Sequence, residues 1–172
     1  IAYVNFGGEK KLVMFVGGGY DAGYENAAYN QTNGIGAGVY MFDANNGDLL
    51  WWTSANATAA KGAEAYTNAS ASTINMKYSV VSQINAIDRD SDGLVDNLYF
   101  GDLGGQGFRV DLNNAATGAD ASAKKGNFAK RVVRLFNEHA TDGVSPRFYE
   151  MPSFSIHDSD NGYVAAVAFS SG

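Results

Sequence analysis

The chain has 172 residues, of which 18 are acidic and 12 are basic, so its net charge is −6. This length is enough to bury the core of one domain. The absence of cysteine excludes disulfides, thiol catalysis and cysteine-ligated zinc, and no apolar run is long enough for a membrane span. The acidic balance, without a basic stripe, argues against nucleic acid and anionic lipid as partners.

The composition favours a β protein rich in turns. Glycine contributes 21 residues, aromatic residues make up 13% of the chain and charged residues only 17%. Apolar runs rich in Val, Tyr, Phe, Leu and Trp, bounded by Gly, Asn or Asp, are typical of strands. In chain order these runs predict strands at residues 12–16, 38–42, 49–53, 78–87, 98–101, 108–112, 131–136 and 163–169.

Three long segments between these strands are expected to be loops, at residues 20–37, 54–77 and 113–129. Each is dominated by Ala, Asn, Gly, Ser and Thr, and loops of this length are usually binding loops or insertions. No segment shows a sustained helical period. The best helix candidate is the Ala-rich stretch 57–66, which Gly62 interrupts.

A repeated pattern of polar turn, apolar strand and small residues underlies these elements. It occurs at residues 7–18, 92–102 and 160–172, and a second shared strand follows the first two copies at residues 38–43 and 107–111. Repeats of several short strands are typical of propeller blades. The sequence therefore predicts an all-β fold of antiparallel blades, about two of them, in a partial or modified β-propeller. A generic antiparallel sandwich is the alternative.

We expect residues 1–172 to form a single β domain that is a fragment of a larger exported protein. The chain begins with Ile1, and a propeller needs about four to eight blades. Residues 39–51 read Val-Tyr-x-x-Asp-x-x-x-Gly-x-x-x-Trp, which resembles the blade motif of quinoprotein-type propellers. The resemblance implies that Trp51 or Trp52 docks one blade onto the next.

The strongest chemical motif is the acidic loop of residues 88–96, which reads Asp-x-Asp-x-Asp-Gly-x-x-Asp. Four aspartates in nine residues repel each other unless a cation binds between them or water fully solvates them. Calcium takes about six to eight oxygen ligands, and alternating aspartates around a tight turn supply them. We therefore expect the acidic loop to bind Ca²⁺ through Asp88, Asp90, Asp92, the carbonyl of Leu94, and Asp96.

The acidic loop differs from an EF-hand, whose twelfth loop position is a bidentate Glu. Tyr99 occupies that position here and lies in an expected strand, so we expect the loop to join two strands. Magnesium fits less well, because it rarely uses a cage made only of protein ligands. The related turn at residues 157–162 has fewer acidic side chains and is expected to be a plain turn.

Signatures of catalysis are missing from the sequence, and we expect no enzyme activity. The chain lacks Gly-x-Ser-x-Gly, a P-loop and His-Glu-x-x-His. Residues 17–22 match the dinucleotide pattern Gly-x-Gly-x-x-Ala, but no amphipathic helix is expected after them. The two histidines, His139 and His157, stand in no recognisable catalytic setting.

The acidic loop continues directly into residues 97–111, and this whole run resembles the C-terminal propeller of the PilY family. Residues 12–21, 38–43 and 152–154 are also similar to that family, whereas the long loops are not. Its members are exported proteins of type IV pili that act in pilus biogenesis and as tip adhesins. The resemblance implies a quinoprotein-like β-propeller with calcium at Asp88, Asp90, Asp92, Leu94 and Asp96.

The resemblance also implies a function. Calcium would shift the balance between pilus extension and retraction, and with it twitching motility and adhesion. The partners would be pilins, minor pilins and a host-cell receptor, and the protein would lie at the cell surface on the pilus, associated with the outer membrane. Two other classes stay open: an integrin-α-like propeller module whose calcium is purely structural, and a fragment of a quinoprotein-like dehydrogenase.

Overall fold

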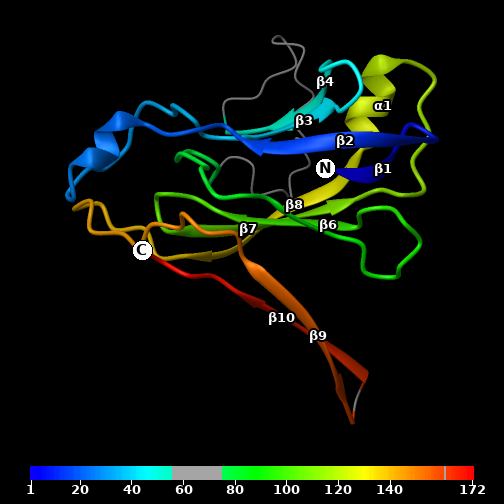
Figure 1. Cartoon of the computed structure of the whole chain (residues 1–172). Coiled ribbons are helices and arrows are strands. Elements are labelled where there is room, and N and C mark those ends of the chain that lie inside the picture. The colour runs from blue at the N-terminus through cyan, green and yellow to red at the C-terminus, as the bar shows by residue number, and fades with distance from the viewer. Residues whose placement is uncertain (56–74, 161) are drawn as a thin grey trace.

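The structure is a computed structural model and describes residues 1–55, 75–160 and 162–172. These residues form an all-β fold of antiparallel sheets, in which each ladder joins two strands that are neighbours in the sequence (Figure 1). The first sheet consists, in order, of β1 (Ala2–Phe6), β2 (Glu9–Gly17), β3 (Val39–Asp43) and β4 (Leu49–Thr53). The second consists of β5 (Asn85–Ile87), β6 (Asn97–Gly101), β7 (Gln106–Leu112) and β8 (Ala129–Asn137).

The two sheets face each other and enclose one hydrophobic core (Figure 1). Alternate side chains of each strand point inward, so Val39 and Met41 of β3 and Phe108 and Val110 of β7 are fully buried. Burying a side chain of this size contributes about 1.5–3 kcal/mol to stability. The packing of one sheet on the other therefore supplies most of the apolar burial of the described chain.

The predicted internal repeat appears in the topology. Its three copies become β2, β6 and β10 (Gly162–Ala168), and each of these is paired with the strand just before it. The second shared strand becomes β3 in the first sheet and β7 in the second. The two sheets thus have the same connectivity. The closed propeller remains a prediction, because the structure shows two sheets and a ribbon.

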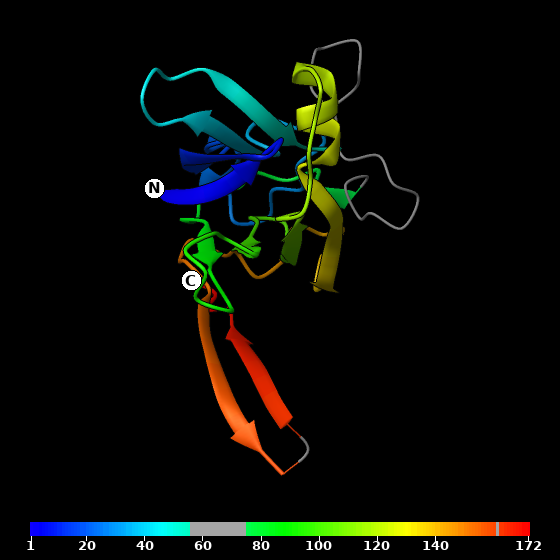
Figure 2. The ribbon, with the colours of Figure 1, turned by 90° about the vertical axis from the view of Figure 1, so that its right-hand side faces the viewer.

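Strands β9 (Ser153–Ser159) and β10 form a two-stranded ribbon that projects from the two sheets (Figures 1 and 2). Its base is attached through aromatic contacts. The ring of Phe154 lies 5.6 Å from that of Tyr99 in β6, and Phe169 lies 4.9 Å from Phe136 in β8. Beyond these contacts most side chains of the ribbon are exposed.

The predicted strands at residues 12–16, 38–42, 49–53, 98–101, 108–112, 131–136 and 163–169 are confirmed to within a few residues. The strand predicted at residues 78–87 is wrong except over Asn85–Ile87. The reason lies at Val80, whose N–H donates to the carbonyl of Gly36 at 3.0 Å and whose carbonyl accepts from the N–H of Gly19 at 3.1 Å. This backbone therefore pairs with the first long loop instead of a sheet strand.

Glycine at position 17 permits this close approach of two backbones. A Cβ there would lie 2.3 Å from the carbonyl oxygen of Val80, closer than any real contact. The segment that follows is the short 3₁₀ helix η1 (Ala22–Glu25), not the amphipathic α-helix of a dinucleotide site. Gly17, the first glycine of the dinucleotide pattern, therefore serves the packing of the loop.

Several elements escaped the prediction: β1, β9, η1 and the helix α1 (Ala121–Asn127). Two of the expected loops, at residues 20–37 and 113–129, thus contain short helices. Asp120 begins α1 by accepting a hydrogen bond from the N–H of Ala123 at 2.9 Å, and Lys124 pairs with Glu9 at 2.7 Å. The helix candidate at residues 57–66 lies outside the described residues.

Among the described residues, no helix has both the length and the apolar character needed to cross a membrane.

Candidate metal site

The acidic loop joins β5 to β6, as expected, and closes a hairpin between two strands. Ile87 pairs with Asn97 at the base of the hairpin, and the N–H of Asp96 donates to the carbonyl of Ile87 at 2.8 Å. The ladder below the loop therefore fixes the distance between its first and last residues. This local geometry brings Asp88 and Asp96 together although seven residues separate them.

Three of the predicted ligands meet in space. One carboxylate oxygen each from Asp88, Asp90 and Asp96 lies within 4.8 Å of the other two. Oxygens that bind one calcium ion at about 2.3–2.6 Å lie at most about 5 Å apart, so this spacing fits a shared cation. Among the described residues these three side chains form the one group of metal-ligating side chains with such spacing.

Asp92 lies outside this group. Its Oδ1 accepts a hydrogen bond from the N–H of Leu94 at 2.8 Å, which supports the turn. Leu94 itself is half-buried and stands between Gly93 and the buried Val95. Coordination by Asp92 and by the carbonyl of Leu94 therefore remains a prediction.

Backbone N–H groups hold the carboxylates in place. Asp88 accepts from the N–H of Ser91 at 2.7 Å and from that of Gly93 at 2.8 Å, one hydrogen bond to each oxygen. Both donor residues have positive φ, +64° at Ser91 and +84° at Gly93. Asp96 accepts from the N–H of Arg89 at 2.8 Å. These bonds satisfy part of the negative charge and leave further lone pairs for a ligand.

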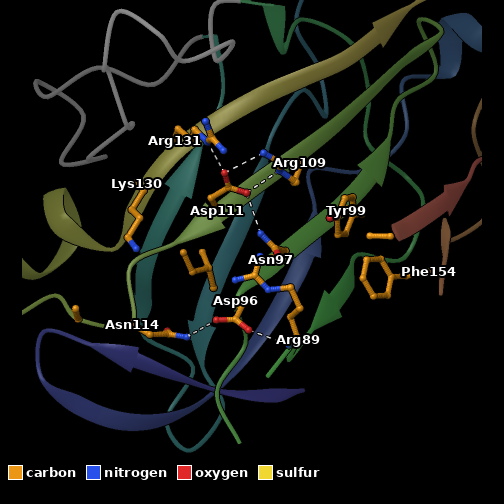
Figure 3. A pocket seen from close by; sticks show the side chains of 13 residues that line it. Arg89, Asp96, Asn97, Tyr99, Arg109, Asp111, Asn114, Lys130, Arg131 and Phe154 are labelled. Atoms are coloured by element: carbon orange, nitrogen blue, oxygen red, sulfur yellow. Dashed lines mark hydrogen bonds and ion pairs between the residues drawn. The ribbon is translucent and has the colours of Figure 1, made fainter. Parts of the chain in front are cut away.

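The rest of the chain also holds the acidic loop. The N–H of Val95 donates to the carbonyl of Tyr3 in β1 at 2.9 Å, which ties the loop to the first sheet. The Asn114 amide donates to Asp96 at 3.0 Å and to the carbonyl of Val95 at 3.2 Å (Figure 3). Asn114 therefore orients the last predicted ligand from a different loop.

A positive charge also lies beside the acidic loop. A Cβ at position 93 would be 3.2 Å from Lys10 Nζ, and the same ammonium lies 4.8 Å from the centre of the Tyr3 ring. Lys10, which lies in β2 and pairs with Asn5 of β1, thus reduces the negative potential of the loop. Sequence reasoning missed Lys10 and Asn114, because neither belongs to the local motif and no pattern links them to it.

The second acidic turn, at residues 157–162, ends the β9–β10 ribbon. Its described carboxylates, Asp158 and Asp160, do not belong to any group of three metal-ligating side chains among the described residues. The histidines are engaged with neighbours: His139 stacks on Tyr78 with ring centres 4.5 Å apart, and His157 contacts the hydroxyl of Ser155 at 2.9 Å.

Comparisons with protein-family models, with curated proteins and with solved structures find no match for this chain.

Proposed function

We propose that the acidic loop binds Ca²⁺. The observation that supports this is the convergence of Asp88, Asp90 and Asp96, which come from the first, third and ninth positions of the motif. Three carboxylates that share one centre repel each other unless a cation lies between them. A divalent cation at that centre relieves the repulsion and accepts their oxygens as ligands.

The donor set favours calcium over other metals. The group contains carboxylates and no histidine or cysteine, and hard oxygen donors suit calcium, magnesium and manganese. Magnesium demands octahedral geometry and keeps most of its water. We propose that Asp92 and the carbonyl of Leu94 complete the calcium coordination. The free oxygen of Asp92 reaches the ion by rotation of the side chain, or through a water molecule.

We propose, from the resemblance to the PilY family, that the chain belongs to an exported pilus-associated protein and acts by binding and not by catalysis. Two sheets with the same four-stranded connectivity support the propeller interpretation, since a propeller blade is a four-stranded antiparallel sheet. In this proposal calcium orders the acidic loop, which then presents a defined surface to pilins, minor pilins or a host-cell receptor. Pilus extension, retraction and adhesion would respond to calcium.

The test is calcium titration calorimetry on this chain and on Asp90→Asn. The asparagine has the shape of aspartate but lacks its charge, so we expect the calcium dissociation constant to rise about tenfold or more. Asp142→Asn is the matched control, because Asp142 is exposed and hydrogen-bonds only to the N–H of Val144 among the contacts of the described residues. Calcium binding unchanged in Asp90→Asn, or absent from the unaltered chain, would contradict the proposed site.

A further inference from the structure

A groove separates the outer face of the second sheet from the β9–β10 ribbon (Figure 3). One hollow of about 690 Å³ lies over Asn97, Tyr99 and Asp111. A second hollow of about 470 Å³ lies farther along the ribbon, beside Tyr163. Arg89 and residues of the ribbon line both, so the two hollows form one continuous ribbon groove.

The ribbon groove is positively charged although the chain is acidic. Four cationic side chains and two carboxylates line it, so its net charge is +2, whereas the net charge of the whole chain is −6. The cationic residues are Arg89, Arg109, Lys130 and Arg131, and the acidic ones are Asp96 and Asp111. A local excess of one sign in a concave surface favours ligands of the opposite charge.

Asp111 organises two of these cations. Its carboxylate contacts Nε of Arg109 at 2.6 Å and pairs with Arg131, and Asn97 donates to it at 2.8 Å. Lys130 and Arg89, in contrast, have no such carboxylate partner. Neither side chain makes an ion pair or hydrogen bond with any described residue. These two cations are therefore available to an anionic group in the groove.

The other wall of the groove is apolar. Phe154, Ile156 and Ala165 lie on one face of the ribbon, because Ile156 pairs with Ala165 and successive side chains alternate between faces. Tyr163 extends this wall and is 81% exposed, and Ile156 is 45% exposed. A cluster of exposed apolar side chains often marks a surface that binds a partner.

The ribbon also offers unpaired backbone. It has only two strands, and within the described chain neither β9 nor β10 pairs with a third. Such free edges accept an extended segment by strand addition, which supplies backbone hydrogen bonds to the incoming chain. Figure 2 shows that the ribbon stands clear of the sheets, so a segment can reach it.

We propose that the ribbon groove binds an extended, acidic segment of a partner protein. In an extended segment, alternate side chains point to opposite sides. Acidic side chains on one side would face Lys130 and Arg89, and apolar side chains on the other would cover Ile156 and Tyr163. A nucleic acid fits less well, because it brings many phosphates to a chain with a net charge of −6 and has no apolar side to set against the ribbon.

The groove also shares a residue with the acidic loop. Asp96 lines the groove and belongs to the carboxylate group of the loop. A calcium ion bound there would neutralise Asp96 and make the groove more positive, so calcium would tighten binding of the acidic segment. This coupling rests on the proposed calcium site, whereas the groove itself does not.

The test uses fluorescence anisotropy with two short labelled peptides, one alternating glutamate with valine and one alternating lysine with valine. In chelator we expect the chain to bind the glutamate peptide and not the lysine peptide. Lys130→Glu and Tyr163→Ser should each weaken binding about fivefold or more, since each removes one contact at the surface. Lys77→Glu and Val144→Ser change equally exposed side chains elsewhere and should leave binding intact.

Three results would overturn the groove proposal: no binding of the glutamate peptide, equal binding of both peptides, or wild-type affinity in Lys130→Glu and Tyr163→Ser. Tighter binding of single-stranded DNA than of the glutamate peptide would overturn the choice of partner. A calcium arm separates the two proposals. At a calcium concentration that half-saturates the unaltered chain, calcium should tighten peptide binding by the unaltered chain more than by Asp90→Asn. If calcium does not tighten peptide binding by the unaltered chain, the coupling to the calcium site is contradicted, whereas the proposal that the groove binds the peptide is not.

Discussion

At the scale of single residues, Asp102 is an unusual carboxylate because it is fully buried. Its oxygens accept hydrogen bonds from the N–H of Gly104 at 3.0 Å, the N–H of Gln106 at 2.9 Å and the Gln106 amide at 2.9 Å. Burial raises the pKa of Asp102 to about 7, and these hydrogen bonds, together with the more distant Arg134, offset only part of the rise.

This pKa predicts a pH dependence of stability. Between the ordinary aspartate pKa of 3.8 and about 7, the unfolded chain has released the Asp102 proton and the folded chain retains it. The unfolded state then binds fewer protons, so the free energy of unfolding falls as pH rises, by up to about 1.4 kcal/mol per pH unit from this group. Above pH 7 this loss is complete.

We expect Asp102→Asn to flatten this dependence, because asparagine does not titrate. Urea unfolding at pH 5 and at pH 7 measures it: the unaltered chain should lose more stability between the two pH values than the variant. Asp142→Asn serves as the control with an exposed carboxylate, and its pH dependence should match that of the unaltered chain. The same slope in Asp102→Asn and the unaltered chain would show that this carboxyl group does not titrate in that range.

At the scale of residues, the sequence predicts contacts between residues of one short motif but not contacts between distant segments of the chain. Asp88, Asp90 and Asp96 were predicted as ligands from their spacing alone, and the structure brings them together. Asp92, predicted from the same spacing, lies outside this group, and its carboxylate accepts a hydrogen bond from the backbone of the loop, so its role as a ligand stays a prediction. Asn114 was not predicted as a partner of Asp96, since its position depends on how a distant loop folds back.

At the scale of elements, β4 shows which of two adjacent tryptophans holds the sheets together. Trp51 is 1% exposed, and its ring centre lies 5.2 Å from that of Phe128, which precedes β8 in the second sheet. Trp52 points to the opposite face of the first sheet and stacks on Tyr40 with ring centres 5.5 Å apart. Sequence reasoning left both open for the docking role, and the structure places Trp51 between the sheets.

We therefore expect Trp51→Ala to cost about 3–5 kcal/mol of stability, because it leaves a cavity between the sheets. Trp52→Ala should cost clearly less, since that ring is partly exposed and stacks on Tyr40 of its own sheet. Urea unfolding of the two variants gives the comparison within one strand. If Trp51→Ala does not fold, Trp51→Phe replaces it. Equal losses at the two positions would argue against a docking role specific to Trp51.

Elements written as runs of apolar and aromatic residues were predictable, and β4 matches its predicted bounds. The elements that escaped have weak local signals. β9 is built from Ser, His and Asp as well as apolar residues, and α1 has Lys and Gly but no apolar stripe. Residues 78–84 have the apolar side chains of a strand and yet form a loop. Their backbone hydrogen-bonds at Val80 to Gly19 and Gly36 of another loop and not to a neighbouring strand.

At the scale of the whole molecule, the core does not depend on the acidic loop. The loop lies at one end of the second sheet, and apart from the buried Val95 its residues stay outside the hydrophobic core. Removing calcium should therefore leave the two sheets folded. A ligand that binds only the folded state still stabilises it in proportion to the logarithm of its concentration.

We expect thermal unfolding in calcium to occur at a temperature higher by a few degrees than in chelator, with the same far-ultraviolet circular dichroism at low temperature in both. Such a result fits calcium as a signal that leaves the fold intact. Loss of the β signal in chelator would instead support the purely structural calcium of the integrin-α-like alternative. Asp90→Asn provides the control, since its melting temperature should rise less at the same calcium concentration.

The order of strands within each sheet has a consequence for how the chain folds. Every ladder closes a stretch of chain between sequence neighbours, and the entropy lost on closing a loop grows with its length. Each sheet can then nucleate from its own tight hairpins, without waiting for a distant strand to diffuse into register. The rate-limiting step of folding is then the docking of the two formed sheets, in which Trp51 and Phe128 come into contact and water leaves the space between them.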